Sequence, residues 1–503
     1  MTARCLLLGL DVGSSFVKAA LLDAASGLRV AAASSPAAEM RIDAPFPGWA
    51  EQDPRDWWLN VVHATREAMR ESAARPEEVA AIGISYQMHG LVLVDREGQV
   101  LRPSIIWCDS RAVETGERAF EELGRINCFA RLLNSPGNFT ASKARWVKEH
   151  EPDVFARADK MLLPGDYVGL RMTGRAATTA CGLSEAILWD YLDHRVSQDL
   201  LDVLGLDPSL VPEVVPTFGN QGELTAPAAG ELGLRAGTPV AYRAGDQPNN
   251  AFSLRVLDPG EVAATAGTSG VVYGVGGQAV WDSDSRVNTF LHVTHTPEAP
   301  RFGSLLCVNG TGALNSWLRR ALGGKAEGGV GLSYDEMNEL AGGAPIGSDG
   351  VVVLPFGNGA ERSLGNREPG VSIHGLSVVR HDRRHLLRAA QEGIVFALHH
   401  GMGIMREMGV EARTVRAGRA NMFLSPLFAR AFAAVSGATL ELFETDGAQG
   451  AARGAGVGAG LFEGTAGAFH GLRLVSRIEP DASDRDRYLQ AYAAWERALR
   501  REL

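Results

Sequence analysis

The chain has 503 residues, of which 45% are hydrophobic and 21% charged, a composition typical of a globular protein with a large core. Its formal net charge of −10 and its lack of a basic run argue against a nucleic-acid partner. No apolar stretch reaches the roughly 18 residues that a membrane span requires, so none is expected. The length predicts about two to four domains.

The cysteines and the first residues indicate the compartment. The five cysteines are scattered and include no Cys-x-x-Cys pair, so neither a disulfide framework nor a zinc site is predicted. The first apolar stretch, Cys5 to Leu10, is interrupted by Asp11 and lacks a small-residue cleavage site, so we expect no signal peptide. A cytoplasmic protein is therefore expected.

The first half of the chain begins with strands and then a helix. Apolar runs between turn-forming residues predict three antiparallel strands, at Cys5–Asp11, Phe16–Asp23 and Leu28–Ser34. A helix is expected from Pro54 to Ala74, because Asp53 is a suitable N-cap and proline fits the first turn.

A second strand region precedes a helical segment. The apolar, β-branched run Val79–Ser85 predicts a strand that leads into Tyr86-Gln87-Met88-His89-Gly90, and Leu91–Asp95 predicts another. Polar groups at the end of a strand are well placed to bind a ligand. Residues 110–220 are predicted to be mostly helical, as an insertion that forms one wall of a cleft.

The second half repeats the first in outline. A strand at Thr238–Ala244 ends on Gly245-Asp246-Gln247, and Glu261–Ala266 with Val271–Val275 predicts a hairpin. Apolar residues at helical spacing predict a mostly buried helix at His385–Met408, with Gly409 as its stop. Closely spaced glycines and alanines in residues 446–456 allow a helix to pack tightly against a neighbour or a nucleotide base, and packing alone is the commoner reason.

Two small glycine loops carry the strongest signal. Leu10-Asp11-Val12-Gly13-Ser14-Ser15 follows the first strand, and Ala266-Gly267-Thr268-Ser269-Gly270 joins the second hairpin. Glycines let the backbone approach a ligand closely, and the hydroxyls and free N–H groups can hold phosphate oxygens. A tight hairpin explains a single loop equally well, whereas the repetition indicates a duplicated domain that holds a nucleotide.

These residues carry a resemblance to a known family. The chain resembles the FGGY family of carbohydrate kinases and is most similar within it to the members that phosphorylate xylulose. The resemblance extends over nearly the whole chain and rests most on Gln87-Met88-His89-Gly90. Further matching segments are Gly48-Trp49-Ala50-Glu51-Gln52-Asp53-Pro54, Ile106-Trp107-Cys108-Asp109-Ser110-Arg111, Phe139-Thr140-Ala141-Ser142-Lys143 with Trp146, Leu163-Pro164-Gly165-Asp166-Tyr167, Gly245-Asp246, and the Gly-Thr-Ser-Gly loop at 267–270.

The resemblance implies an α/β fold of two ribonuclease-H-like (actin-like ATPase) domains around a central cleft. Residues 1–244 would form the N-terminal domain on the sugar side, and residues 245–503 the C-terminal domain on the ATP side. ATP and Mg²⁺ are the implied cofactors, and a small sugar is the implied substrate. Dimers are common among such kinases, so a homodimer is an expectation by analogy.

Phosphoryl transfer to a sugar needs a base for the hydroxyl proton, a metal to bridge the phosphates, and exclusion of water. Asp246 is the candidate base, because it follows a predicted strand and the matching aspartate of the family acts as the base; a turn aspartate capping a helix that begins at Pro248 is the alternative. Asp11, which ends a buried strand, is a candidate to hold Mg²⁺ through water, with Asp246 as the second metal residue; Asp11 bonding to its own turn is the alternative.

Sugar recognition needs neutral donors and acceptors matched to hydroxyls, beside an apolar wall. Met88 and His89 match the family's substrate pair, and Trp107, Asp246 and Gln247 are the other candidates for sugar contact. A histidine at a strand end is often only a structural group. Arg111, near Trp107, is as well explained by an ordinary ion pair.

The candidate nucleotide-binding residues come from both halves of the chain. They are Asp11, Gly13, Ser14, Ser15, Gly267, Thr268, Ser269, Gly312, Gly418 and Asn421. The family's adenine loop usually reads Gly-Gly-Gly-Ala, whereas residues 416–421 here read Arg-Ala-Gly-Arg-Ala-Asn. Gln247 stands where the xylulose-phosphorylating members commonly have asparagine, and such a change can shift hydroxyl selection by roughly 1 to 3 kcal/mol.

The predicted function is ATP-dependent phosphorylation of a ketopentose at its terminal hydroxyl, with D-xylulose as the first candidate. Glycerol, ribulose, gluconate or a pentitol would use the same chemistry. An actin-fold ATPase coupled to a partner protein would have no need of Gln87-Met88-His89, and a catalytically silent sugar-binding regulator would be expected to lose Asp246 or the phosphate loops. Both features are present.

Overall fold

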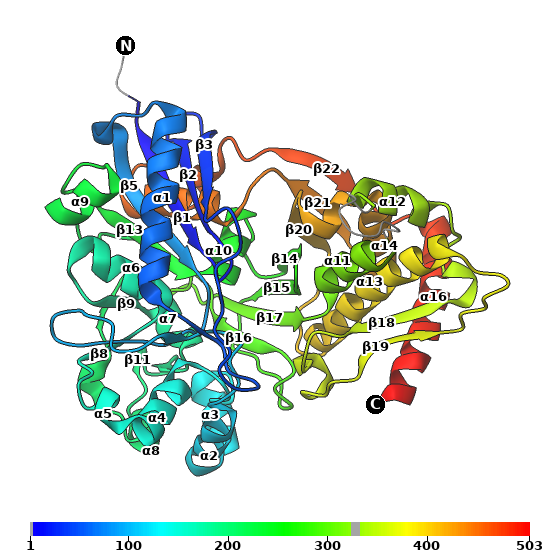
Figure 1. Cartoon of the computed structure of the whole chain (residues 1–503), viewed down its shortest axis with the longest axis horizontal. Coiled ribbons are helices and arrows are strands. Elements are labelled where there is room, and N and C mark those ends of the chain that lie inside the picture. Colours follow the sequence, from blue (N-terminus) through cyan, green and yellow to red (C-terminus); the bar gives the residue numbers. More distant parts are fainter. Residues whose placement is uncertain (1–3, 323–331) are drawn as a thin grey trace. The chain divides into compact units, whose positions relative to one another are not determined.

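The computed structural model describes residues 4–322 and 332–503 (Figure 1). Its contacts divide the chain into two compact units that are not consecutive halves of the sequence. The first unit contains the residues up to Arg255, Phe290–Phe302 and Thr445–Leu472. The second contains Val256–Thr289, Gly303–Glu444 and Arg473–Leu503. Asp246 therefore belongs to the first unit.

A five-stranded sheet organises the first unit. Its strands, in spatial order, are β13 (Val240–Gly245), β5 (Val79–Tyr86), β1 (Leu6–Val12), β2 (Val17–Asp23) and β3 (Arg29–Ser35). The pairs β1–β2 and β2–β3 are antiparallel, which confirms the predicted opening strands. β5 is parallel to both β1 and β13, so the carboxyl ends of these three strands share one edge of the sheet.

Helices from opposite ends of the sequence pack on this sheet. α1 (Pro54–Ser72) is capped as predicted, since the Asp53 side chain accepts the Arg55 N–H, and it lies along β2 and β3 (Figure 1). α15 (Gly447–Gly458) packs against β1, β5 and β13. A Cβ atom at Gly9 of β1 would lie 1.9 Å from the Ala448 carbonyl oxygen, so only glycine permits this approach.

The remainder of the first unit is mainly helical with very short strands, as predicted for residues 110–220. Its helices are α2 (Val113–Leu123), α3 (Arg125–Leu132), α4 (Thr140–His150), α5 (Pro152–Phe155), α6 (Pro164–Thr173), α7 (Ala180–Glu185), α8 (Gln198–Leu204), α9 (Ala226–Leu232) and α10 (Asp246–Ser253). Its short strands are β4 (Glu51–Gln52), β6 (Val92–Val94), β7 (Ser104–Ile105), β8 (Lys160–Leu162), β9 (Ala177–Thr179), β10 (Trp189–Asp190), β11 (Arg195–Val196) and β12 (Glu213–Val215).

The second sheet repeats the pattern of the first. Its strands, in spatial order, are β16 (Asn288–Leu291), β17 (Phe302–Val308), β15 (Gly270–Gly276), β14 (Glu261–Ala266), β20 (Thr414–Gly418), β21 (Thr439–Phe443) and β22 (Leu474–Ile478). The predicted hairpin β14–β15 is antiparallel, and β20 is parallel to both β14 and β21. The order β15-β14-β20-β21 thus has the same pairing directions as β2-β1-β5-β13, which confirms the predicted repeat.

Helices bury the core of the second unit. They are α11 (Thr311–Leu322), α12 (Tyr334–Gly342), α13 (Arg383–Glu407), α14 (Pro426–Ser436) and α16 (Ala482–Glu502), beside the hairpin of β18 (Val352–Phe356) and β19 (Gly370–His374). α13 confirms the helix predicted at 385–408, although it starts slightly earlier because Asp382 supplies its N-cap. None of the helices in the described ranges is both long and apolar enough to cross a membrane.

Candidate active site

The sheet of the first unit gathers three of the predicted segments at one edge. Val12 and Gly245 both pair with Tyr86 of the central strand β5. Because these strands are parallel, the residues at their carboxyl ends emerge at the same level. Asp11, the segment 87–89 and Asp246 are therefore brought together by strand register.

Asp246 has the properties expected of a general base. It is the first residue of α10, directly after β13, and its side chain is partly exposed. The pKa of its carboxyl is raised to about 7, chiefly by burial and also by the neighbouring negative charge of Asp11, against hydrogen bonds from Gln247 that lower it. A carboxylate with a pKa near neutrality is well matched to accepting a proton from a hydroxyl.

Asp11 is held in a narrow space between strands and a helix terminus. The Ser85 hydroxyl donates a hydrogen bond of 2.8 Å to its Oδ1. Burial is the main cause that raises its pKa, and the charge of Asp446 adds to this, while Lys18 and Ser85 lower it. A Cβ atom at Gly447, the first residue of α15, would lie 2.5 Å from Asp11 Oδ2, so a glycine is required where the helix begins.

The Asp11 and Asp246 carboxylates fit a magnesium ion chemically. The charge of Asp11 raises the pKa of Asp246, so a cation between them would relieve an unfavourable interaction. In the described part of the chain, no three side chains of the metal-ligating types form a cluster that could hold an ion. Mg²⁺ typically retains several waters and uses one or two carboxylates with substrate phosphates, so a pair of carboxylates is an appropriate donor set.

His89 follows β5 in an unusual backbone conformation. Its φ is +61°, in the left-handed region that non-glycine residues rarely adopt. Its Nδ1 lies 2.9 Å from the Glu185 carbonyl oxygen, and because a carbonyl can only accept, Nδ1 carries the hydrogen. The ring packs edge to face on Phe139, with centroids 4.7 Å apart, and its side chain is 17% exposed. Met88 beside it is buried.

Glu185 is a residue near the site that sequence reasoning missed. It is 2% exposed, and neither carboxylate oxygen makes a hydrogen bond of normal geometry within the described ranges. Burial is the main cause that holds the pKa of this carboxyl well above its usual value, and the charges of Asp246 and Asp166 raise it further, while Tyr86 lowers it. Glu185 ends the six-residue helix α7, where no motif marked it.

The remaining candidates of the first unit are Trp107, Gln247 and the residues of the first glycine loop. Trp107 is 42% exposed, and its Nε1 donates to Ser14 Oγ at 3.4 Å. Gly13 closes a tight turn by donating its N–H to the Phe16 carbonyl at 3.0 Å, and Ser15 follows within that turn. Gln247 lies in the first turn of α10 and is partly exposed.

Arg111 is explained by an ion-pair network. Its guanidinium is buried, with 2.6 Å contacts to Asp109 and to Glu51. It also lies over the Trp49 ring, 3.7 Å from the centroid. The ordinary ion pair, which the sequence left open, is therefore the arrangement found for Arg111.

The second unit brings most of the predicted phosphate-binding residues together. Gly267, Thr268 and Ser269 form the turn between β14 and β15. The Gly312 N–H donates to the Gly267 carbonyl at 2.9 Å, and the Thr311 hydroxyl donates to the same oxygen at 3.0 Å. A Cβ atom at Gly312 would lie 2.3 Å from that oxygen, so the start of α11 can approach the loop only as glycine.

The last two candidates border the same loop. Gly418 ends β20, which is parallel to β14, so it emerges at the same edge of the sheet as Gly267. Asn421 follows with φ +54°, and its Nδ2 would be 3.3 Å from a Cβ atom at Gly267. Gly418 and Asn421 therefore lie in a tight turn beside the Gly267–Ser269 loop, even though the family's glycine run is absent.

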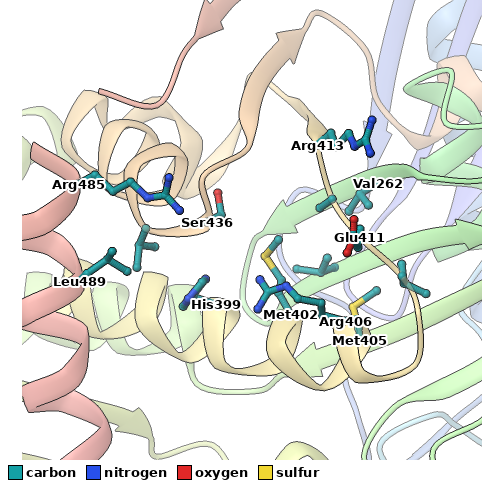
Figure 2. A pocket seen from close by; sticks show the side chains of 14 residues that line it. Val262, His399, Met402, Met405, Arg406, Glu411, Arg413, Ser436, Arg485 and Leu489 are labelled. Carbon is teal, nitrogen blue, oxygen red and sulfur yellow. The ribbon is translucent and has the colours of Figure 1, made fainter. Parts of the chain in front are cut away.

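A cavity of about 430 Å³ in the second unit contains none of the predicted site residues. It lies where α13 passes the start of β14, and Figure 2 shows Arg406, His399 and Arg485 among the side chains around it. The Gly267–Ser269 loop and Gly418 lie at the opposite ends of β14 and β20, so this cavity does not correspond to the predicted nucleotide site of the second unit.

Comparisons with known proteins show which family the chain resembles as a whole. Residues 6–253 match the model of the N-terminal domain of the FGGY family of carbohydrate kinases. A xylulose kinase of Streptomyces rubiginosus is 32% identical over 401 residues, covering 78% of this chain and 75% of that protein. The L-xylulose/3-keto-L-gulonate kinase of Escherichia coli (strain K12) is 29% identical over 509 residues, covering 98% and 96%. The crystal structure of a xylulose kinase from Brucella ovis superposes with a TM-score of 0.85 at 30% identity, covering 98% of both chains.

Proposed function

Because the chain belongs to the FGGY family of carbohydrate kinases, with two actin-like domains, we propose that it transfers the γ-phosphoryl group of ATP to the terminal hydroxyl of D-xylulose. The products are D-xylulose 5-phosphate and ADP. The observation that carries the proposal is the placement of Asp246, Asp11 and His89 at one edge of the first sheet, in a chain whose relatives include several xylulose kinases.

Asp246 is the proposed base. As the sugar oxygen forms its bond to the γ-phosphorus, the bond from that phosphorus to the oxygen that leaves with ADP breaks, and the hydroxyl proton passes to the Asp246 carboxylate. Asp11 and Asp246 would hold Mg²⁺, which supplies positive charge to the phosphate oxygens. Water must be kept from the γ-phosphorus, because it competes with the sugar hydroxyl.

The other candidates divide between the two ligands. Met88, His89, Trp107 and Gln247 are proposed to contact the sugar, with residues 1–244 on the sugar side. Gly13, Ser14 and Ser15 are proposed to line the phosphate path. Residues 245–503 are proposed to bind most of the nucleotide, with phosphate contacts at Gly267–Ser269 and Gly312 and base contacts near Gly418 and Asn421. We propose that the enzyme acts in the cytoplasm.

A different polyol or keto sugar is the second candidate, and two observations favour testing it. Gln247 replaces the asparagine common among the xylulose-phosphorylating members, and the Escherichia coli relative named above acts on L-xylulose and 3-keto-L-gulonate. One additional methylene at a sugar-binding position changes the free energy of discrimination between sugars by roughly 1 to 3 kcal/mol, which is enough to alter the preferred sugar.

ADP release from Mg-ATP tests the substrate directly. The purified protein is assayed alone and with D-xylulose, L-xylulose, L-ribulose, glycerol, D-gluconate and pentitols. We expect D-xylulose to give the highest kcat/KM. Preference for another sugar would keep the kinase mechanism and overturn the substrate. Turnover that no sugar stimulates would contradict the proposal and favour an ATPase.

The variant Asp246→Asn tests the base. We expect kcat to fall about 10²- to 10⁴-fold, because general-base catalysis contributes this much, with little change in the KM for ATP. Asp202→Asn, at an exposed position on α8, is the matched control and should retain full turnover. Unchanged kcat in Asp246→Asn would remove the residue from the proposed role.

A further inference from the structure

The first turns of α4 contain a lysine that is completely buried. Lys143 has no exposed side-chain surface, although lysine is among the residues least often buried in proteins. Its Nζ donates to the carbonyl oxygen of His89 at 2.8 Å and to that of Ile106 at 3.0 Å. One ammonium group therefore links the two loops that contain the candidate sugar residues His89 and Trp107.

An ion pair does not explain this burial. Within the described ranges no carboxylate lies within 4.0 Å of Lys143 Nζ. Asp109 is the largest favourable charge acting on it, but its Oδ2 accepts the Ala50 N–H at 2.6 Å and contacts Arg111. Burial accordingly lowers the pKa of Lys143 to about 7. Burying an amine costs free energy of desolvation. Hydrogen bonds that go only to backbone carbonyls offset this cost best where those buried carbonyls would otherwise lack a donor.

The backbone of the His89 loop has to be held in place by neighbouring side chains. His89 adopts φ +61°, and a bulky residue persists in this region only when its surroundings fix it. Three side chains of α4 and its N-cap hold the loop: the Phe139 ring packs on the imidazole, the Thr140 hydroxyl donates to the Gly90 carbonyl at 3.2 Å, and Lys143 holds the His89 carbonyl. Two successive carbonyls are thus bound from one face of one helix.

We propose that Lys143 is a positioning residue of the sugar site. It fixes the His89 and Ile106 carbonyls and thereby fixes the positions of the His89 imidazole and the Trp107 indole relative to each other. This inference rests on the proposed function. Lys143 touches neither substrate nor the reacting atoms. Its loss should weaken sugar binding selectively, because both hydrogen bonds of its Nζ go to the loops that contain the candidate sugar residues.

The test compares Lys143→Met with Lys148→Met. Methionine matches the unbranched lysine side chain as far as Cε and removes the amine that donates the hydrogen bonds. Lys148 is the matched control, because it is on the same helix and its Nζ also donates to a backbone carbonyl, that of Gly205, which lies outside the candidate site. We expect Lys143→Met to raise the KM for the preferred sugar about 10-fold or more, with the KM for ATP within about twofold of the wild type.

The outcomes separate the possible roles. An unchanged sugar KM in Lys143→Met, or an equal rise in Lys148→Met, would overturn the inference and leave Lys143 as a structural residue. If Lys143→Met does not fold, Lys143→Gln decides in the same way, because its side chain is shorter than that of lysine and carries no ammonium group. Failure of the proposed function is seen in the wild type, as turnover that no sugar stimulates, and the inference would fall with it.

Discussion

Glu361 shows how the surroundings of a single residue can decide its charge. The residue is completely buried, and both of its carboxylate oxygens accept the Asn309 N–H, at 3.0 and 3.1 Å. Burial raises the pKa of Glu361 to about 7, and hydrogen bonds from Asn309 and Gly310 only partly oppose this. The segment 309–310 leads directly into α11 and its Gly312, so this carboxyl supports the loop beside the candidate phosphate site.

The raised pKa makes a prediction about pH. The folded-state pKa of about 7 lies above the ordinary glutamate value of 4.5, so the folded protein binds more protons than the unfolded chain between these values. The stability that Glu361 contributes is therefore present below about pH 4.5 and is lost as pH rises to about 7. Glu361→Gln removes the charge, so its Tm minus that of the wild type should rise between pH 5 and pH 8, by about 2 °C or more. A difference that stays constant across this range would contradict the prediction.

Other residue roles depend on neighbours that are distant in sequence. The motif around His89 could be recognised from the sequence, and so could the glycine loops. The carbonyl of Glu185, which fixes the hydrogen on His89 Nδ1, could not, because α7 approaches β5 only through the tertiary fold. Lys143 was recognised as part of a matching segment, but its two carbonyl partners come from separate loops, and no local pattern shows such a bond.

At the scale of elements, α15 shows what a glycine-rich sequence does in a helix. Gly454 faces β13, and a Cβ atom there would lie 2.4 to 2.7 Å from atoms of the Tyr242 ring. The helix can therefore approach the sheet closely only because this position has no side chain. Close packing, the commoner of the two reasons considered for this segment, accounts for its glycines here.

A pair of glycine substitutions tests this packing. Gly454→Ala should destabilise the protein by about 1 to 3 kcal/mol, because the added methyl overlaps the aromatic ring. Gly403→Ala in α13 is the matched control, since a Cβ atom there meets nothing within 4 Å, and alanine should stabilise that helix by about 0.5 to 1 kcal/mol. Denaturant unfolding of both variants measures whether each substitution lowers or raises the free energy of unfolding. A shift in the same direction for both would show that contact with Tyr242 is not the cause.

Elements formed by nearby residues could be predicted, and their distant partners could not. Apolar runs and turn residues identified β1, β2 and the hairpin β14–β15, because consecutive strands usually pair. The parallel pairing of β13 with β5 joins residues more than a hundred positions apart, and it depends on the whole intervening insertion. The order of the strands, and hence the meeting of Asp11 with Asp246 at one edge of the sheet, was seen only in the structure.

On the scale of the whole molecule, the first unit is discontinuous in the sequence. The family model matches residues 6–253, yet the unit also includes residues 445–472. A core cluster joins Leu7, Ala81 and Ala241 of the sheet to Ala448 and Ala452 of α15. Residues 1–255 alone would therefore expose an apolar sheet face that α15 covers in the complete chain.

This arrangement predicts how fragments behave. Residues 1–255 expressed alone should not unfold cooperatively, whereas the same fragment joined by a Gly/Ser linker to residues 445–472 should recover a cooperative thermal transition, measured by circular dichroism. Ala448→Glu together with Ala452→Glu in the fused fragment is the control, because two buried charges on the packing face should abolish the recovery. A cooperative transition in residues 1–255 alone would show that the sheet does not need α15. The predicted dependence follows from backbone contacts as close as the approach of Gly83 to the Ala451 carbonyl, where a Cβ atom would lie 2.0 Å away.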